Sequence, residues 1–128
     1  MTERINIINE PIKSYLAGSE ERISLQKKYD ELASETIEIP IIINGKAIET
    51  NDLGKCIMPH DHQKVLATYH KTSNIEVDQA IQSSLDAWSD WSKTDLGFRT
   101  NIFKKAATLL AGKWRNTINA ATMLNQSK

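Results

Sequence analysis

Apolar residues first recur at helical spacing in residues 19–33. Leu25, Tyr29 and Leu32 follow one another at intervals of four and three, which places them on one narrow face of a helix. Ser19 can cap this helix, because its hydroxyl can accept from the free N–H groups of the first turn. The pattern therefore predicts a surface helix whose thin apolar face contacts a larger body.

The next segment instead shows the pattern of a β-hairpin. Residues 38–43 are rich in β-branched side chains and are followed by Asn44-Gly45. This dipeptide tolerates the positive φ angles that a two-residue hairpin turn requires, and residues 46–50 alternate as a returning strand. Pro40 has no N–H to donate, so its strand should be an edge strand or should be entered at that point.

Two further extended segments follow the hairpin, at residues 55–58 and 65–70. They are separated by the polar stretch Pro59-His60-Asp61-His62, which we expect to form the connection between two strands. Short antiparallel strands are therefore predicted for this part of the chain.

From Ser73 onward the apolar spacing is again helical. Ser73 and Glu76 can form a capping box, in which each side chain reaches the other's backbone N–H. A second helix is expected to begin near Thr94 or Asp95 and to end at Gly112, and a third to follow it. The residues expected to face inward are Val77, Ala80, Ile81, Leu85, Trp88, Trp91, Ile102, Phe103, Ala106, Leu109, Leu110, Trp114, Ile118, Ala121 and Leu124.

These patterns predict an α+β fold with three segments. Residues 1–36 form an N-terminal arm and helix, residues 37–72 form the short strands with the hairpin at Asn44-Gly45, and residues 73–128 form three helices. The chain shows no internal repeat and no low-complexity stretch.

Composition narrows the class of protein. The 128 residues include 16 basic and 16 acidic side chains, so the formal net charge is zero and no stretch has the basic density that nucleic-acid binding needs. The longest unbroken apolar run, Ile41–Ile43, is far shorter than the ~20 residues of a membrane span. The single cysteine excludes an intrachain disulfide and is typical of a reducing compartment. We therefore expect neither a nucleic-acid nor a membrane partner.

Cys56, His60 and His62 are the only cluster of potential soft metal ligands. Their spacing matches no standard zinc site and offers no clear fourth ligand, so we favour an ordinary polar connection between two strands. Cys56 as a nucleophile would need a cationic partner or a helix N-terminus to lower its pKa. Within a predicted strand, a small buried apolar side chain is the commoner outcome.

Other candidate groups have structural explanations. Trp88, Trp91 and Trp114 could form a stacking platform for a ligand, but their spacing on amphipathic helices favours core packing. Arg99 and the pair Lys104-Lys105 are typical of a solvated helix face. The five glycines are isolated and form no phosphate-binding loop. The residues alone therefore assign no catalytic, cofactor-binding or metal-binding residue.

Several exact stretches nevertheless resemble the pyrroline-5-carboxylate dehydrogenase family, whose members are also called glutamate-γ-semialdehyde dehydrogenases and belong to the aldehyde dehydrogenase superfamily. The resemblance covers nearly the whole chain. A proline is expected at the position of Lys113, in a loop. The matching stretches are Asn9-Glu10-Pro11, Tyr15, Gly18-Ser19, Glu21-Arg22, Leu25, Ile39-Pro40, Gly45-Lys46, Pro59–His62, Val65–Ala67, Tyr69-His70, Ala87-Trp88, Trp91, Arg99, Ile102-Phe103, Lys105–Ala107, Leu109-Leu110, Arg115, Thr122–Leu124 and Gln126–Lys128.

The resemblance implies an NAD-dependent oxidation of glutamate semialdehyde to glutamate, in the breakdown of proline. In such enzymes a cysteine thiolate attacks the aldehyde, hydride passes to the nicotinamide, and a glutamate-activated water hydrolyses the thioester. The implied fold is the N-terminal part of the α/β aldehyde dehydrogenase fold, here a partial scaffold of the cofactor-binding domain. The implied full-length enzyme binds a small-molecule substrate and NAD and forms a homo-oligomer.

The resemblance also implies that the catalytic cysteine, the general-base glutamate and the cofactor-binding turns lie beyond the position that matches Lys128. Cys56 does not align with that cysteine. On this basis the chain is expected to be an N-terminal fragment of the enzyme, inactive alone and without NAD of its own.

Two hypotheses for function remain open from the sequence. The first is this fragment of a dehydrogenase. The second is a stand-alone, non-catalytic α+β module that binds a protein partner through the helix at 19–33 or through the last helices. A bacterial cytoplasm is expected rather than a mitochondrial matrix, because the first residues contain Glu3 and Glu10 and do not have the composition of a transit peptide.

Overall fold

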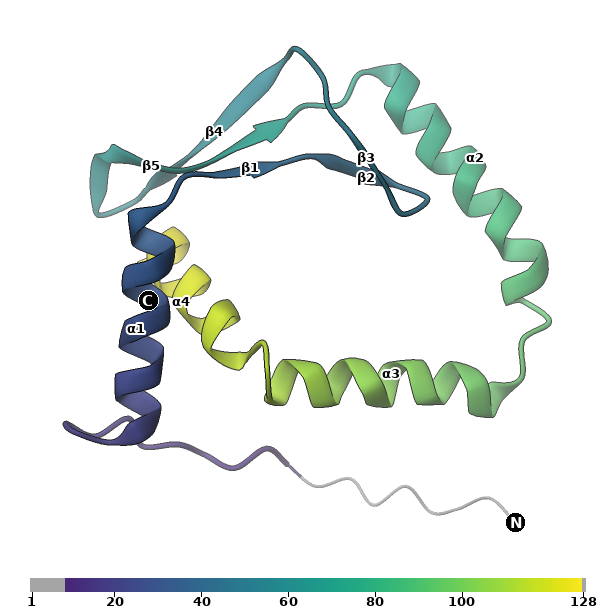
Figure 1. The fold of residues 1–128 in the computed structure, drawn as a ribbon. Helices are drawn as coiled ribbons and strands as arrows, with labels where there is room; N and C mark the ends of the chain where they lie inside the picture. Colours follow the sequence, from purple (N-terminus) through teal and green to yellow (C-terminus); the bar gives the residue numbers. More distant parts are fainter. Residues whose placement is uncertain (1–8, 128) are drawn as a thin grey trace.

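The computed structural model of the chain describes residues 9–127. A small sheet and the pair α1 and α4 lie at one side, and α2 and α3 extend from them as two sides of an open frame (Figure 1). The elements are α1 (Glu20–Ser34), β1 (Ile37–Ile39), β2 (Ile41–Ile43), β3 (Lys46–Ile48), β4 (Leu53–Met58), β5 (Asp61–His70), α2 (Asn74–Trp91), α3 (Leu96–Ala111) and α4 (Arg115–Gln126).

The core lies where α1 and α4 meet the sheet (Figure 1). Met58, Leu66 and Leu124 form a buried apolar cluster at this junction. The predicted narrow face of α1 contributes Tyr29 and Leu32, which pack against the cluster. Ser19 accepts a hydrogen bond from the backbone N–H of Arg22, which confirms the predicted N-cap.

The strands form two separate sheets. β2 and β3 make the predicted hairpin, with Asn44 and Gly45 both at positive φ, and β4 pairs antiparallel with β5. One pairing departs from the expected antiparallel arrangement: β1 runs parallel to β5. Pro40 explains the difference, because it ends β1 before β2 begins and so allows the two strands to join different sheets.

The connection between β4 and β5 is shorter than the sequence pattern indicated. Only Pro59 and His60 form the turn, and Asp61 and His62 already belong to β5. Irregular register next to Ile57 accommodates the tight connection.

The helix boundaries after the sheet agree with the local signals. The Ser73–Glu76 capping box is present at the start of α2, the Asp95 side chain accepts from two backbone N–H groups at the start of α3, and Gly112 ends α3. The inward-facing positions of these two helices do not form a core within this chain, which agrees with the expectation that the chain is a fragment. Neither α2 nor α3 contains a buried residue, because no other described element packs over those faces.

The tryptophans show the same exposure. Trp88 is 68% exposed, Trp91 40% and Trp114 47%, so the predicted core packing does not occur within this chain. The whole chain exposes 10465 Å². A compact monomer of this mass exposes roughly 6,800 Å². The fold is therefore a partly uncovered frame around one small core.

This exposure predicts how the isolated chain behaves in solution. The uncovered apolar faces of α2 and α3 should bind a hydrophobic fluorescent dye or drive self-association, because contiguous apolar surface of this extent is unstable in water. Dye fluorescence and light scattering across a concentration series measure both effects. A monomer with a sharp cooperative melt and no dye binding would contradict the prediction.

A second prediction concerns Gly54 in β4, which lies directly opposite Tyr69 in β5. A Cβ added at Gly54 would lie 2.2 Å from Cζ of the Tyr69 ring, so the ring covers the space that a side chain would occupy. Gly54→Ala should destabilise the chain by about 1–3 kcal/mol in urea unfolding. In a Tyr69→Ala background the same substitution should cost much less. Equal costs in both backgrounds would show that the ring is not the cause.

Candidate functional site

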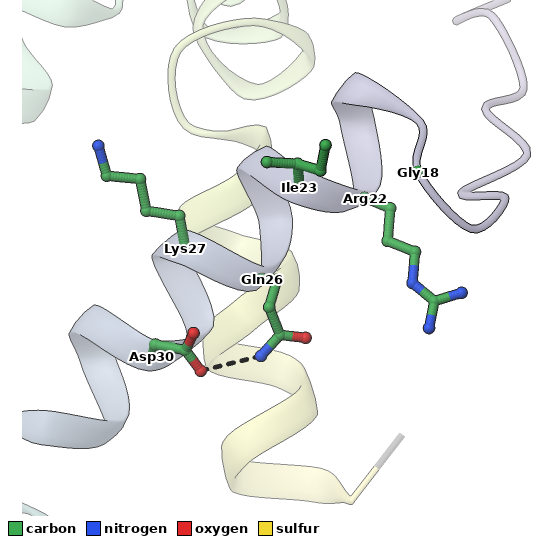
Figure 2. Close-up of a pocket in the computed structure, with 6 residues that line it drawn as sticks. All are labelled: Gly18, Arg22, Ile23, Gln26, Lys27 and Asp30. Carbon is green, nitrogen blue, oxygen red and sulfur yellow. Dashed lines mark hydrogen bonds between the residues drawn. The ribbon is translucent and has the colours of Figure 1, made fainter.

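A pocket of about 470 Å³ lies on the outer surface of α1 (Figure 2). It is lined by Gly18, Arg22, Ile23, Gln26, Lys27 and Asp30. Gln26 donates a hydrogen bond of 2.8 Å to Asp30, while the side chains of Arg22 and Lys27 point away from each other. The pocket therefore brings together no acid–base pair and no pair of cations aimed at a common ligand.

A smaller cavity of about 180 Å³ lies between the sheet and the helix pair α1 and α4. Its wall is apolar and includes Leu32, Leu66, Leu124 and the free thiol of Cys56. Cys56 is half-buried, as expected for a small apolar side chain in a strand. These surroundings provide none of the cationic groups that activate a thiol as a nucleophile.

The three soft ligands of the sequence do not converge. His60 bonds through Nε2 to the Tyr29 hydroxyl at 3.5 Å and through Nδ1 to the Ser127 hydroxyl at 3.0 Å, whereas Cys56 faces the apolar cavity. His60 and His62 both line a surface pocket beside the turn, and Cys56 is not part of its lining. Within residues 9–127 no three His, Cys, Asp or Glu side chains are grouped to hold a metal ion. His60 instead links α1, the β4–β5 turn and the end of α4.

Among residues 9–127, the one polar residue that is buried as a whole is His70, at the end of β5. Only 8% of its surface is exposed, and its Nε2 lies 2.9 Å from the carboxylate of Glu38 on β1. Its Nδ1 lies 2.7 Å from the Thr50 backbone nitrogen and 2.8 Å from the Thr50 carbonyl oxygen. A neutral ring can accept the N–H, and a charged ring can donate to the carbonyl. His70 thus joins β5 to β1 and to the segment that follows β3.

The carboxylate of Glu38 is the main cause that raises the pKa of His70 above its ordinary value of 6.5, and burial opposes it. The Thr50 carbonyl and the charge of Glu49 act in the same direction as Glu38. Sequence reasoning missed this cluster. The alternation of β5, which places residues 66, 68 and 70 on one face, was the signal that could have found it.

A second polar cluster holds the N-terminal arm to α4. Arg115 forms an ion pair with Glu10, and its Nε donates to the Tyr15 hydroxyl at 3.3 Å. Asn119 donates to the same hydroxyl at 3.4 Å. Every group in this cluster has a partner inside the chain, so its role is to fix the arm rather than to bind a ligand. It too was not found from the sequence.

No helix among the described residues is long and apolar enough to cross a membrane. Among residues 9–127, the polar clusters of His60, His70 and Arg115 hold neighbouring elements together. They do not bring a set of catalytic groups to one place.

The comparisons with known proteins agree with one another. The profile of the aldehyde dehydrogenase family matches residues 47–128. The Delta-1-pyrroline-5-carboxylate dehydrogenase of Agaricus bisporus is 43% identical over 123 residues, which is 95% of this chain, and the probable counterpart in Schizosaccharomyces pombe is 41% identical. The chain spans about 22% of the length of these curated relatives.

Solved structures give the same result. The Delta-pyrroline-5-carboxylate dehydrogenase of Mycobacterium tuberculosis superposes with a TM-score of 0.91 at 33% identity, covering 97% of this chain and 23% of that one. The same enzyme has also been solved bound with NAD. A Thermus 1-pyrroline-5-carboxylate dehydrogenase superposes with a TM-score of 0.86 at 22% identity, which shows a shared fold.

The His70 cluster predicts a pH dependence of stability. Because the pKa of His70 is raised in the folded state, its contribution is fully present below pH 6.5 and is lost as the pH rises through the folded-state pKa. Urea unfolding across this range should show stability falling with pH. Glu38→Gln removes the main cause and should flatten the curve, while Glu49→Gln should change it less. A steeper curve in Glu38→Gln would contradict the assignment.

Proposed function

The chain belongs to the aldehyde dehydrogenase family, and on that premise we propose that it forms the N-terminal scaffold of an NAD-dependent dehydrogenase that oxidises L-glutamate γ-semialdehyde to L-glutamate. The observation that carries the proposal is the match to Delta-1-pyrroline-5-carboxylate dehydrogenases over 95% of the chain. The TM-score of 0.91 to such an enzyme supports it, because the whole described fold is shared.

The role proposed for these 128 residues is structural. An NAD site of this kind needs backbone N–H groups in a glycine-rich turn, and each glycine here stands alone, with Gly45 at a hairpin turn and Gly112 at a helix end. A catalytic thiol needs an activating neighbour, and Cys56 lies in an apolar wall. The residues present do not fit the cofactor, and they supply no nucleophile for the aldehyde.

The chemistry is therefore assigned to polypeptide outside this chain. The scaffold contributes a small core, the polar clusters around His70 and Arg115 that hold elements together, and the uncovered helices α2 and α3. We propose that the enzyme's substrate, glutamate semialdehyde, contacts those other parts of the enzyme.

The compartment stays a prediction. The relatives from Dictyostelium discoideum and Rattus norvegicus are described as mitochondrial, while the matching Mycobacterium tuberculosis enzyme is bacterial. We propose the bacterial cytoplasm, a reducing compartment that suits a chain with a single cysteine.

The proposal predicts that activity needs more than this chain. The purified chain should not reduce NAD with glutamate semialdehyde. A chimera in which the chain replaces the matching segment of the Agaricus bisporus enzyme should do so, since 43% identity preserves most contacts. NADH absorbance measures both. Turnover by the chain alone, or a folded chimera that lacks activity while the parent enzyme is active, would contradict the proposal.

Cys56 provides a matched control. Cys56→Ala in the chimera should leave the turnover rate within about twofold of the unsubstituted chimera, because the thiol only packs in the cavity wall. Loss of activity with retained folding would make Cys56 a catalytic residue and would overturn the scaffold role.

A further inference from the structure

The uncovered face of α3 contains one charged residue with no partner. Arg99 precedes Ile102 and Phe103 by three and four residues, so it lies within the apolar face of the helix. Sequence reasoning placed Arg99 and the pair Lys104-Lys105 on a solvated face, and the two lysines are indeed exposed, whereas Arg99 differs. Arg99 is half-buried, and its Nε is shielded from solvent without a hydrogen-bond partner among residues 9–127.

Two other cations of the described residues have an acidic partner. The half-buried Arg115 is paired with Glu10, and the cation of Lys71 is paired with Asp52 at 3.0 Å. Within the described residues, no ion pair involves Arg99. An N–H group that is withdrawn from water without an acceptor, as the Nε–H of Arg99 is, is unfavourable. The described residues therefore do not supply the hydrogen-bond acceptor that Arg99 needs.

The face around Arg99 is broad and apolar. Leu96, Phe98 and Phe103 are each more than half exposed, and no described element lies over them. The polar side of the neighbouring helix α2, at Gln79, Gln82, Ser83 and Asp86, lines a pocket with the β2–β3 hairpin. At helical spacing the apolar stripe of α2, at Val77, Ile81, Leu85 and Trp88, lies on the other side of that helix. Both helices thus present uncovered apolar stripes.

We infer that the α3 face centred on Arg99 is a docking surface for the part of the aldehyde dehydrogenase polypeptide that lies outside these 128 residues, and that this partner segment presents a carboxylate to the guanidinium. A planar guanidinium pairs best with a carboxylate, through two parallel hydrogen bonds. When the apolar surroundings are covered, an anion is needed to neutralise the buried charge.

The choice of occupant rests on length and on charge. The matching enzymes are more than four times as long as this chain and contain the same frame at a TM-score of 0.91, so they hold further polypeptide that can cover it. A second copy fits less well, because α3 has no acidic residue between Leu96 and Ala111. A symmetric contact between two α3 faces would bring two Arg99 groups together without an anion.

The inference rests on the proposed function and is tested in the same chimera with the Agaricus bisporus enzyme. Arg99→Met removes the charge and keeps an unbranched apolar side chain. Lys104→Met is the matched control, because Lys104 is exposed on the opposite side of α3. Arg99→Met should accelerate thermal inactivation of the chimera by at least about tenfold, as expected for a buried pair that loses one partner. Lys104→Met should leave the rate within about twofold.

In the isolated chain, Arg99→Met is not expected to be destabilising. There Arg99→Met should leave the urea midpoint unchanged or raise it, since the substitution removes an unsatisfied buried donor. Equal effects of the two substitutions in the chimera, or destabilisation of the isolated chain by Arg99→Met, would overturn the inference.

A cross-linking arm covers the case in which the isolated chain melts without a cooperative transition. A photoreactive phenylalanine analogue at Ile102 of the chimera should form adducts that mass spectrometry maps outside the grafted residues. Adducts within the graft, or to a second copy, would contradict the docking surface. An unsubstituted chimera that folds but does not oxidise glutamate semialdehyde would remove the proposed function and leave the adduct map to decide the docking surface.

Discussion

Apolar side chains stabilise a fold only when other side chains cover them from water. Within this chain, only some of the helices and strands are covered in this way. The cover exists where α1 and α4 meet the sheet, around Met58, Leu66 and Leu124. It does not exist along α2 and α3, which have no buried residue. The capping box of α2 and the Asp95 N-cap of α3 satisfy local backbone groups, but they do not replace tertiary packing as the main source of helix stability.

Polar clusters explain how the frame keeps its shape around so small a core. His70 fastens β5 to β1 and to Thr50, and Arg115 fastens the N-terminal arm to α4. Each cluster is complete within the chain, as buried polar groups must be. Arg99 is the exception, with its Nε unsatisfied. The satisfied clusters lie within the scaffold. The unsatisfied Arg99 lies on the α3 face that we propose as the docking surface for further polypeptide.

The parts of the structure that local signals control were predictable from the sequence. The turn at Asn44-Gly45 and the capping box at Ser73 depend on residues within four positions of one another, and both are present. The parallel pairing of β1 with β5 joins segments about thirty residues apart, which no local pattern specifies. The surroundings of Arg99 were not predictable, because helical spacing identifies an apolar face without saying which residue of the chain covers it. The family was found through exact stretches, and those stretches contain no catalytic group.

Amide hydrogen exchange, measured for α2 and α3 in the isolated chain and again within the chimera with the Agaricus bisporus enzyme, tests most directly whether these helices depend on cover from outside. Because their apolar faces are uncovered, α2 and α3 should exchange much faster in the isolated chain than β4, β5, α1 and α4 do. Within the chimera they should be protected to the same degree as those elements. Equal protection of all six elements in the isolated chain would contradict the account, because it would show that the 128 residues stabilise both helices unaided.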